Sequence, residues 1–152
     1  FMPYRPNQGT PWLTPDEVRS YLRASGMSSS TKISDVLNGY GFSHKPLYFE
    51  RLEEGQVLYQ FIRNASIETG DPKTGNWFCG LGATQQDLAI FGGGSGRRRH
   101  KFEVKHPFIA LIGTARPQSP KWSWDGGGRG GGTQVFVPPN LIGHIASLGP
   151  DE

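Results

Sequence analysis

A glycine-rich stretch near the C-terminal end, "DGGGRGGGTQVFVPPN" from Asp125 to Asn140, constrains this sequence most. Six glycines surround Arg129, and the run changes at once into a polar pair, Thr133 and Gln134, followed by a short apolar run. Glycine lets a main chain adopt unusual conformations and approach a ligand closely. Composition alone favours a flexible loop here, but the direct entry into a strand favours a backbone shaped against a ligand.

The composition is that of a globular domain. The chain has 152 residues, 35% hydrophobic and 12% aromatic, which is enough for one core. No apolar run reaches the length of a membrane span. The single cysteine, Cys79, excludes an internal disulfide, and its apolar neighbours indicate a buried structural thiol. Because the chain starts at Phe1, we expect it to be the C-terminal part of a longer protein.

Charge is distributed unevenly along the chain. Residues 1–96 hold 8 basic and 9 acidic residues, whereas residues 97–152 hold 8 basic and 4 acidic ones. The positive charge therefore lies in the part that carries the long glycine run, which points to an anionic partner there.

The periodicity predicts an α+β fold, with small N-terminal helices followed by a compact, curved antiparallel sheet. Thr14, Pro15 and Glu17 begin a helix with a capping box, and Gly26 ends it. A second helix is expected over 28–39. Strands are expected at 46–52, 55–63, 77–78, 101–115 with a break near Pro107, and 133–139. A short helix is expected at 84–91, a flexible basic loop at 92–100, and a helical turn or two at 140–149.

We expect one compact domain with two parts, a helical segment over 1–54 and a core over 55–152. The four histidines show no paired ligand spacing and Cys79 has no partner cysteine, so the sequence predicts no metal site. The glycine runs match neither a Walker loop nor a dinucleotide-binding fingerprint.

"GGGTQVFVPPNLIGHIASLG" resembles the C-terminal signature of the tuberculosis necrotizing toxin family, in which a glycine triplet, Thr and Gln precede a short strand. "VLYQFI", "GNWFC" and "RHKFEVKHPFIALIGTA" resemble the family's earlier strands, in order, so the resemblance covers residues 55–149. It implies cleavage of NAD⁺ to nicotinamide and ADP-ribose, with Gln134 and His100 as functional residues. Gln60 stands where the family's arginine is expected.

With a glutamine at this position, the sequence is similar to NAD glycohydrolase toxins delivered by type VI secretion. In those toxins an early-strand Gln and a later Asp act together. The matching residues are Gln60 and Asp125. The resemblance implies a secreted effector that acts in the cytoplasm of a target cell on NAD⁺ or NADP⁺. It also implies a cognate immunity protein, and no cofactor because NAD⁺ is the substrate.

The chemistry of NAD⁺ fits this inventory. Nicotinamide leaves as a neutral molecule, and the ribose becomes oxocarbenium-like, so a site needs a carboxylate, a polar clamp, an aromatic wall and cations. Asp125 suits the carboxylate, and Gln60 or Gln134 the clamp. The predicted substrate-binding residues are Arg63, Trp77, Phe78, Trp124, Arg129 and Thr133, and the run Arg97–Arg99 offers further cations for the pyrophosphate.

Each of these residues also has a structural explanation. Asp125 before glycines can make a turn. Gln60 shares a face with Leu58 and Ile62 on strand alternation, as a satisfied core amide would. His100 beside three arginines reads as a solvated loop residue, and the tryptophans and Phe78 read as core.

Two other functions stay open at this level. An ADP-ribosyltransferase would use the same substrate but needs a late glutamate, for which only Glu103 and Glu152 are available beyond position 100. A nucleic-acid-binding module could be built on "GRRRHKFEVK". The Gly-Thr-Gln junction is unexplained by the second, so we expect no nucleic-acid partner.

Overall fold

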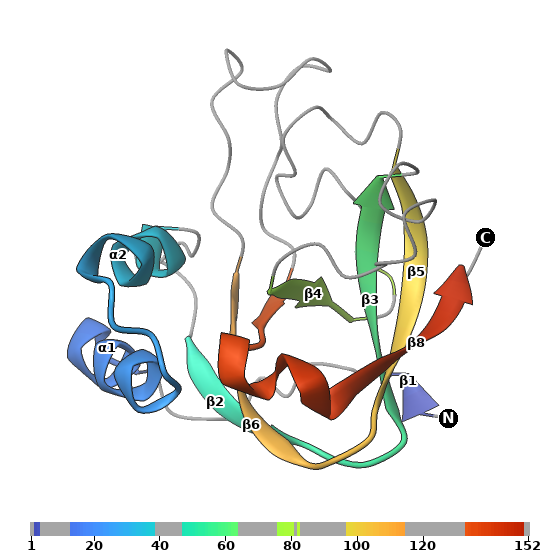
Figure 1. Cartoon of the computed structure of the whole chain (residues 1–152), viewed down its shortest axis with the longest axis horizontal. Coiled ribbons are helices and arrows are strands. Elements are labelled where there is room, and N and C mark those ends of the chain that lie inside the picture. Colours follow the sequence, from blue (N-terminus) through green and yellow to red (C-terminus); the bar gives the residue numbers. More distant parts are fainter. Residues whose placement is uncertain are drawn as a thin grey trace.

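The computed structural model describes residues 2–3, 13–38, 47–63, 76–80, 82, 97–114 and 133–150. In these residues two helices pack on one side of a strongly curved, mainly antiparallel sheet (Figure 1). The expected α+β fold, with N-terminal helices before a curved sheet, is confirmed. No helix of the described part is long and apolar enough to cross a membrane.

Helix α1 spans Pro15–Ala24 and begins as the sequence predicts. The hydroxyl of Thr14 accepts a hydrogen bond from the Glu17 backbone N–H, and the Glu17 carboxylate accepts one from the Thr14 N–H. This capping box satisfies two backbone donors that a helix start leaves open. The chain turns away at Gly26, whose φ of 93° favours glycine.

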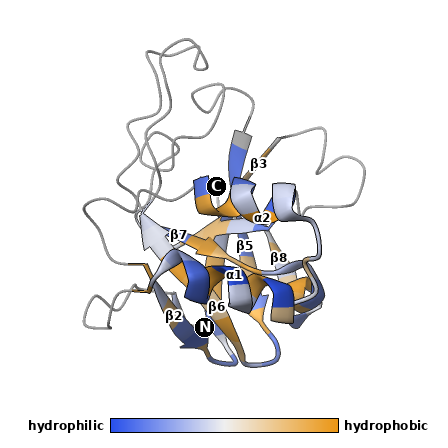
Figure 2. Ribbon diagram, turned by 90° about the vertical axis from the view of Figure 1, so that its left-hand side faces the viewer, coloured by the Kyte–Doolittle hydropathy of each residue, from blue (hydrophilic) through white to orange (hydrophobic). Residues whose placement is uncertain are grey.

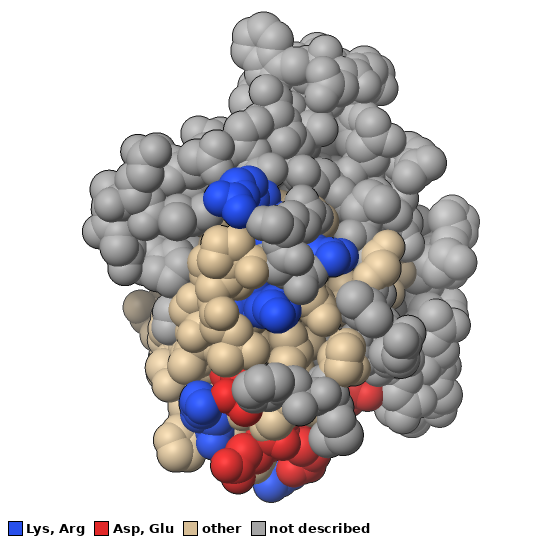
Figure 3. Space-filling model, turned by 90° about the vertical axis from the view of Figure 1, so that its right-hand side faces the viewer, with Lys and Arg blue, Asp and Glu red and all other residues tan. Residues whose placement is uncertain are grey.

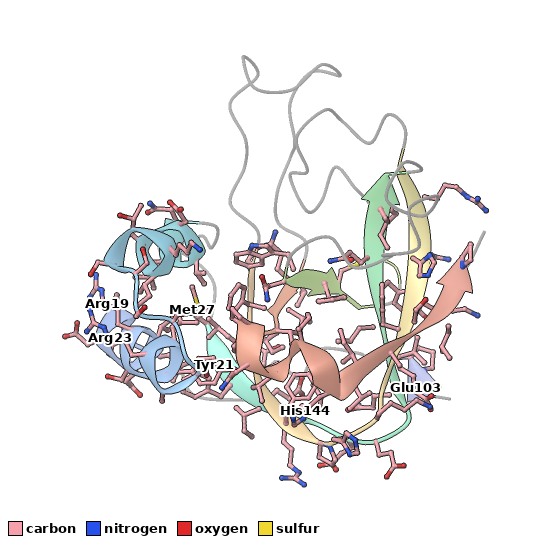
Figure 4. The ribbon with its side chains drawn as sticks, viewed as in Figure 1. Arg19, Tyr21, Arg23, Met27, Glu103 and His144 are labelled. Carbon is pink, nitrogen blue, oxygen red and sulfur yellow. The ribbon has the colours of Figure 1, made fainter. Side chains whose placement is uncertain are left out.

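The helices bury one face and leave the other polar (Figure 2). Helix α2 spans Ser30–Asn38 and buries Ile33, Val36 and Leu37, as predicted. Tyr21 projects from α1 toward the sheet (Figure 4), where its ring contacts Phe49 at 4.7 Å between centroids. Its hydroxyl donates to the carbonyl of Ile109, and burial raises the Tyr21 pKa above its ordinary value.

The strands follow the helices and carry the site. Their bounds in chain order are β2 Tyr48–Leu52, β3 Gln56–Arg63, β4 Trp77–Cys79, β5 Arg97–Val104, β6 Phe108–Thr114, β7 Thr133–Phe136 and β8 Ile145–Pro150, with the short β1 at Met2–Pro3. A 3₁₀ helix, η2, spans Pro139–His144. The sheet order is β2-β6-β7-β4-β3-β5-β8, and β1 pairs in parallel with β3.

Curvature gives the sheet an inner and an outer face. β2 and β3 are consecutive but stand four positions apart in the sheet order, so the sheet bends back on itself. Side chains of β2 and β6, at one end of the strand order, meet side chains of β3, β5 and β8, at the other end, in one apolar cluster. We call the face that carries this cluster the inner face. The cluster comprises Tyr48, Leu52, Leu58, Ile62, Phe78, Phe102, Val104, Phe108, Ala110, Ile112, Val135, Val137 and Ile145, with Leu141 and Ile142 of η2 packed against it.

The outer face carries two smaller clusters. Leu111 and Phe136 pack there with buried residues of α1 and α2, including Val18 and Leu22. Further along the sheet lies a second cluster of Val57, Tyr59, Phe61 and Cys79. Burial raises the pKa of the Cys79 thiol to about 12, which fits the predicted structural role of this residue.

Two local predictions are wrong. Arg97–His100 was expected in a flexible loop but lies in β5, because these residues pair with Gln60–Arg63 of β3. Residues 145–149 were expected to be helical but lie in β8, which pairs with β5. The expected helix at 84–91 and the glycine-rich stretch 126–132 lie outside the described residues.

The proposed boundary between 54 and 55 stays a prediction, although β2 of the first part pairs with β6 of the second.

Leu22 is fully buried between helix and sheet. We therefore expect Leu22→Ala to lower the free energy of unfolding by about 2–5 kcal/mol. Denaturant unfolding followed by circular dichroism and tryptophan fluorescence should give one shared transition at a lower midpoint.

The control is Ser20→Ala on the exposed side of α1. A wild-type midpoint for Leu22→Ala, or separate transitions by the two probes, would show that the helices do not form one cooperative unit with the sheet.

Candidate active site

Gln60 and His100 face each other across β3 and β5 on the inner face. They are register partners, and their exposed fractions are 5% and 3%. Leu58 and Ile62 belong to the inner-face cluster on either side of Gln60, so the face predicted for Gln60 is confirmed. Phe102 lies beside the imidazole, with 5.2 Å between ring centroids. A glutamine and a histidine are thus paired at the margin of an apolar core.

The amide of Gln60 connects two strands. Its Nε2 donates to the carbonyl oxygen of Trp77 at 2.9 Å. Strand β4 is only three residues long and meets β3 at the single register pair Tyr59–Cys79. The side-chain bond therefore reinforces a short ladder and fixes the amide plane of Gln60.

His100 is held at one ring nitrogen. Its Nε2 lies 2.7 Å from the hydroxyl oxygen of Ser147 in β8. Its Nδ1 is buried and has no hydrogen-bond partner among the described residues. A buried polar atom without a partner costs free energy and usually marks strain, an ordered water or a ligand.

Two effects keep the imidazole neutral. Burial lowers the pKa of His100 because it disfavours the charged form, and the positive charge of Arg98 lowers it further. Arg98 is two residues before His100 in β5, so strand alternation places both on the inner face. It is exposed, whereas His100 is buried.

Gln134 and Thr133 lie in β7 but on different faces. Gln134 pairs with Cys79 of β4 and Gly113 of β6, on the outer face. Thr133 shares the face of Val135, which belongs to the inner cluster. The sheet therefore lies between Gln134 and Gln60. The sequence analysis assigns both of them, together with Thr133, to one site.

The two described aromatic candidates pack within the sheet. Phe78 is 2% exposed and makes an edge contact with Phe102 at 5.3 Å. Trp77 is half-buried and makes an edge contact with Phe136 at 5.0 Å. Both contacts are those of core residues, and only Phe78 is on the face of Gln60.

The remaining predicted residues are placed less completely. Arg63 ends β3 opposite Arg97 of β5. Asp125, Trp124 and Arg129 lie outside the described residues, in the stretch between Thr114 and Thr133.

Glu103, the glutamate that a transferase would need, lies on the outer face. It alternates with Phe102 and Val104 in β5, and its carboxylate pairs with Lys105 (Figure 4). It therefore points away from the face of Gln60 and His100. Glu152 lies outside the described residues.

The basic run does not form a single stripe. Arg98 is on the inner face, whereas Arg99 lies over the Tyr59 ring at 5.2 Å on the outer face. Figure 3 shows that acidic side chains gather at one end of the molecule on the side of β5 and β8, whereas basic side chains lie across its middle and also beside the acidic ones. Arg97–Arg99 lie at the start of β5, whereas Glu53 and Glu54 lie in the turn between β2 and β3.

Sequence reasoning missed one contact entirely, the hydroxyl of Ser147 on His100. It also named Arg98 only as one of three cations. In Lys101–Val104 charged residues alternate with apolar ones. The same alternation, extended toward the N-terminus, predicts that His100 and Arg98 lie on the face of the apolar residues.

Two solved structures share this fold. Tse6, solved in complex with Tsi6, has a TM-score of 0.65 and 20% sequence identity over 88% of this chain and 93% of that chain. Rhs1-CT, solved in complex with its cognate immunity protein RhsI1, has a TM-score of 0.50 and 18% identity over 81% of this chain and 94% of that chain. No family model and no curated protein matches the sequence. The chain thus has the fold of Tse6 and Rhs1-CT.

The site predicts a depressed histidine titration. We expect His100 to titrate below its ordinary value of 6.5, and Arg98→Ala to raise its pKa. Since the unfolded chain binds the proton more readily, the free energy of unfolding should fall as the pH drops below about 6.5. Histidine proton signals followed by NMR against pH give the pKa directly.

Lys101→Ala, on the opposite face of the same strand, is the matched control and should leave that pKa nearly unchanged. A His100 that titrates at or above 6.5 would contradict the buried, neutral imidazole.

Proposed function

We propose that this chain is an NAD⁺ glycohydrolase toxin domain that cleaves NAD⁺ or NADP⁺ to nicotinamide and ADP-ribose in a target cell. The observation that carries the proposal is the buried pair of Gln60 and His100, which face each other on the inner face. Burying two polar side chains in an apolar core costs free energy that an apolar pair would avoid. Such pairs are candidates for function rather than stability.

The fold supports the toxin class. Rhs1-CT is solved with a cognate immunity protein and Tse6 with Tsi6, so a tightly binding partner fits a chain of this fold. A free NAD⁺-degrading enzyme would harm the cell that makes it, and a cognate immunity protein would prevent that. We infer delivery as a secreted effector that acts in the cytoplasm of the target cell. The finer relation to the tuberculosis necrotizing toxin family rests on the sequence motifs.

The reaction breaks the bond between ribose C1′ and the nicotinamide nitrogen. Both bonding electrons leave with nicotinamide, which departs neutral, and C1′ gains oxocarbenium character. Water then adds to C1′ and loses a proton. Asp125 would stabilise the developing positive charge, and Gln60, whose amide plane is fixed by Trp77, would orient the substrate.

Incubation with NAD⁺ alone should therefore release nicotinamide and ADP-ribose without any protein acceptor. We expect Gln60→Ala and Asp125→Ala each to lower kcat/KM by about 100-fold or more. Gln56→Ala is the matched control, because Gln56 is a glutamine at the other end of β3. Liquid chromatography of the products measures the rates.

Circular dichroism first establishes that each variant is folded at the assay temperature, because Gln60→Ala also removes the partly buried bond to Trp77. Release of nicotinamide only in the presence of a protein acceptor would favour the transferase. Wild-type rates in both Gln60→Ala and Asp125→Ala would place the site elsewhere.

The cation on the inner face gives a second test. Arg98 is exposed on the face of Gln60 and His100, and a guanidinium matches the geometry of a pyrophosphate. Since a charge-assisted hydrogen bond contributes about 1.5–3 kcal/mol, Arg98→Ala should raise KM for NAD⁺ roughly tenfold or more. Lys101→Ala, on the outer face, should leave KM unchanged, and steady-state kinetics compare the two. An equal effect of both variants would indicate unspecific attraction between the basic strand and the anion.

A further inference from the structure

Ser147 is an exposed residue of the edge strand β8 whose hydroxyl contacts the buried imidazole of His100. The register pairs Ser147 with Phe102, so its side chain is on the inner face, one step from His100. The O···N distance is 2.7 Å, typical of a hydroxyl hydrogen bond. No residue of the proposed reaction requires this contact. Ser147 lies in the stretch that resembles the toxin signature, but the resemblance assigns it no role.

A β-bulge places the hydroxyl. The pairing of β5 with β8 passes from Lys101–Gly149 to Phe102–Ser147, which leaves Leu148 as an extra residue. Gly149 has φ 97°, and a Cβ there would meet no atom within 4 Å, so backbone conformation alone explains the glycine. Bulges commonly redirect a side chain beside a site. Here the bulge lets the Gly149 N–H donate to the Ser147 oxygen at 3.2 Å.

That second bond favours one direction for the first. The Ser147 oxygen accepts a hydrogen bond from the Gly149 N–H, which polarises its own O–H and makes it the better donor. This favours the arrangement in which the hydroxyl donates to Nε2 of His100. In a neutral imidazole the proton is then on Nδ1. Nδ1 is the buried ring nitrogen that has no partner among the described residues.

We propose that Ser147 is a positioning residue that holds the neutral imidazole of His100 as the Nδ1–H tautomer. The effect of this tautomer on NAD⁺ cleavage rests on the proposed function. The tautomer itself is a property of the free protein. The two parts can therefore fail separately.

The test is the tautomer of His100 in ¹⁵N-histidine-labelled protein, read from long-range ¹⁵N–¹H correlation spectra. The wild type and Ser147→Thr, which keeps the hydroxyl and suits a strand, should show Nδ1 protonated and Nε2 unprotonated. Ser147→Ala should lose this fixed state. Ser34→Ala, on the exposed side of α2, is the control and should match the wild type.

Kinetics add the functional part. Ser147→Ala should lower kcat for nicotinamide release about tenfold, the equivalent of one hydrogen bond, and Ser147→Thr should restore it. A wild-type Nε2–H tautomer, or an unchanged tautomer in Ser147→Ala, overturns the proposal. Absence of NAD⁺ cleavage in the wild type, with the tautomer as expected, overturns the proposed function and leaves the role of Ser147 standing.

Discussion

The register between β3 and β5 is the constraint on which the site depends. Seven pairs, from Val57–Glu103 to Arg63–Arg97, fix which side chains of both strands reach the inner face. A slip of one residue in β5 would turn His100 to the outer face and bring Arg99 to the inner one. The apolar members of the inner-face cluster resist such a slip, because it would expose Phe102 and Val104. The same packing that stabilises the sheet therefore places the polar pair.

Electrostatics then determine the protonation state of His100. Burial and the nearby Arg98 keep His100 neutral, so its ring can donate from one nitrogen and accept at the other. The bond from Gln60 to the Trp77 carbonyl and the bond between Ser147 and His100 fix both side chains. Side chains already held in place lose little entropy when a substrate binds, which is the advantage of a preorganised site.

Much of the fold could be predicted from local sequence signals. The capping box of Thr14 and Glu17, and the alternation in β3, are short-range and appear as expected. The strand character of Arg97–His100 was missed because three successive arginines hide a period of two. The face of Gln134 could not be predicted because β4 and β7 meet through pairings distant in sequence.

The contact of Ser147 with His100 could not be predicted for a different reason. It depends on a β-bulge in the edge strand β8. The only sequence sign of this extra residue is Gly149, two positions after Ser147. Serine and glycine are both common in turns, so their presence here does not indicate a bulge. Asp125, the carboxylate of the proposed reaction, comes from the resemblance and stays a prediction.

The central claim is that the inner face around Gln60 and His100 receives a dinucleotide. Its most direct test is an NMR titration of the protein with a non-hydrolysable carba analogue of NAD⁺. The account predicts that the side-chain signals of Gln60 and His100 shift most, and that those of Lys101 on the outer face hardly move. Binding that leaves both inner-face signals unchanged, or no binding at millimolar analogue, would contradict it.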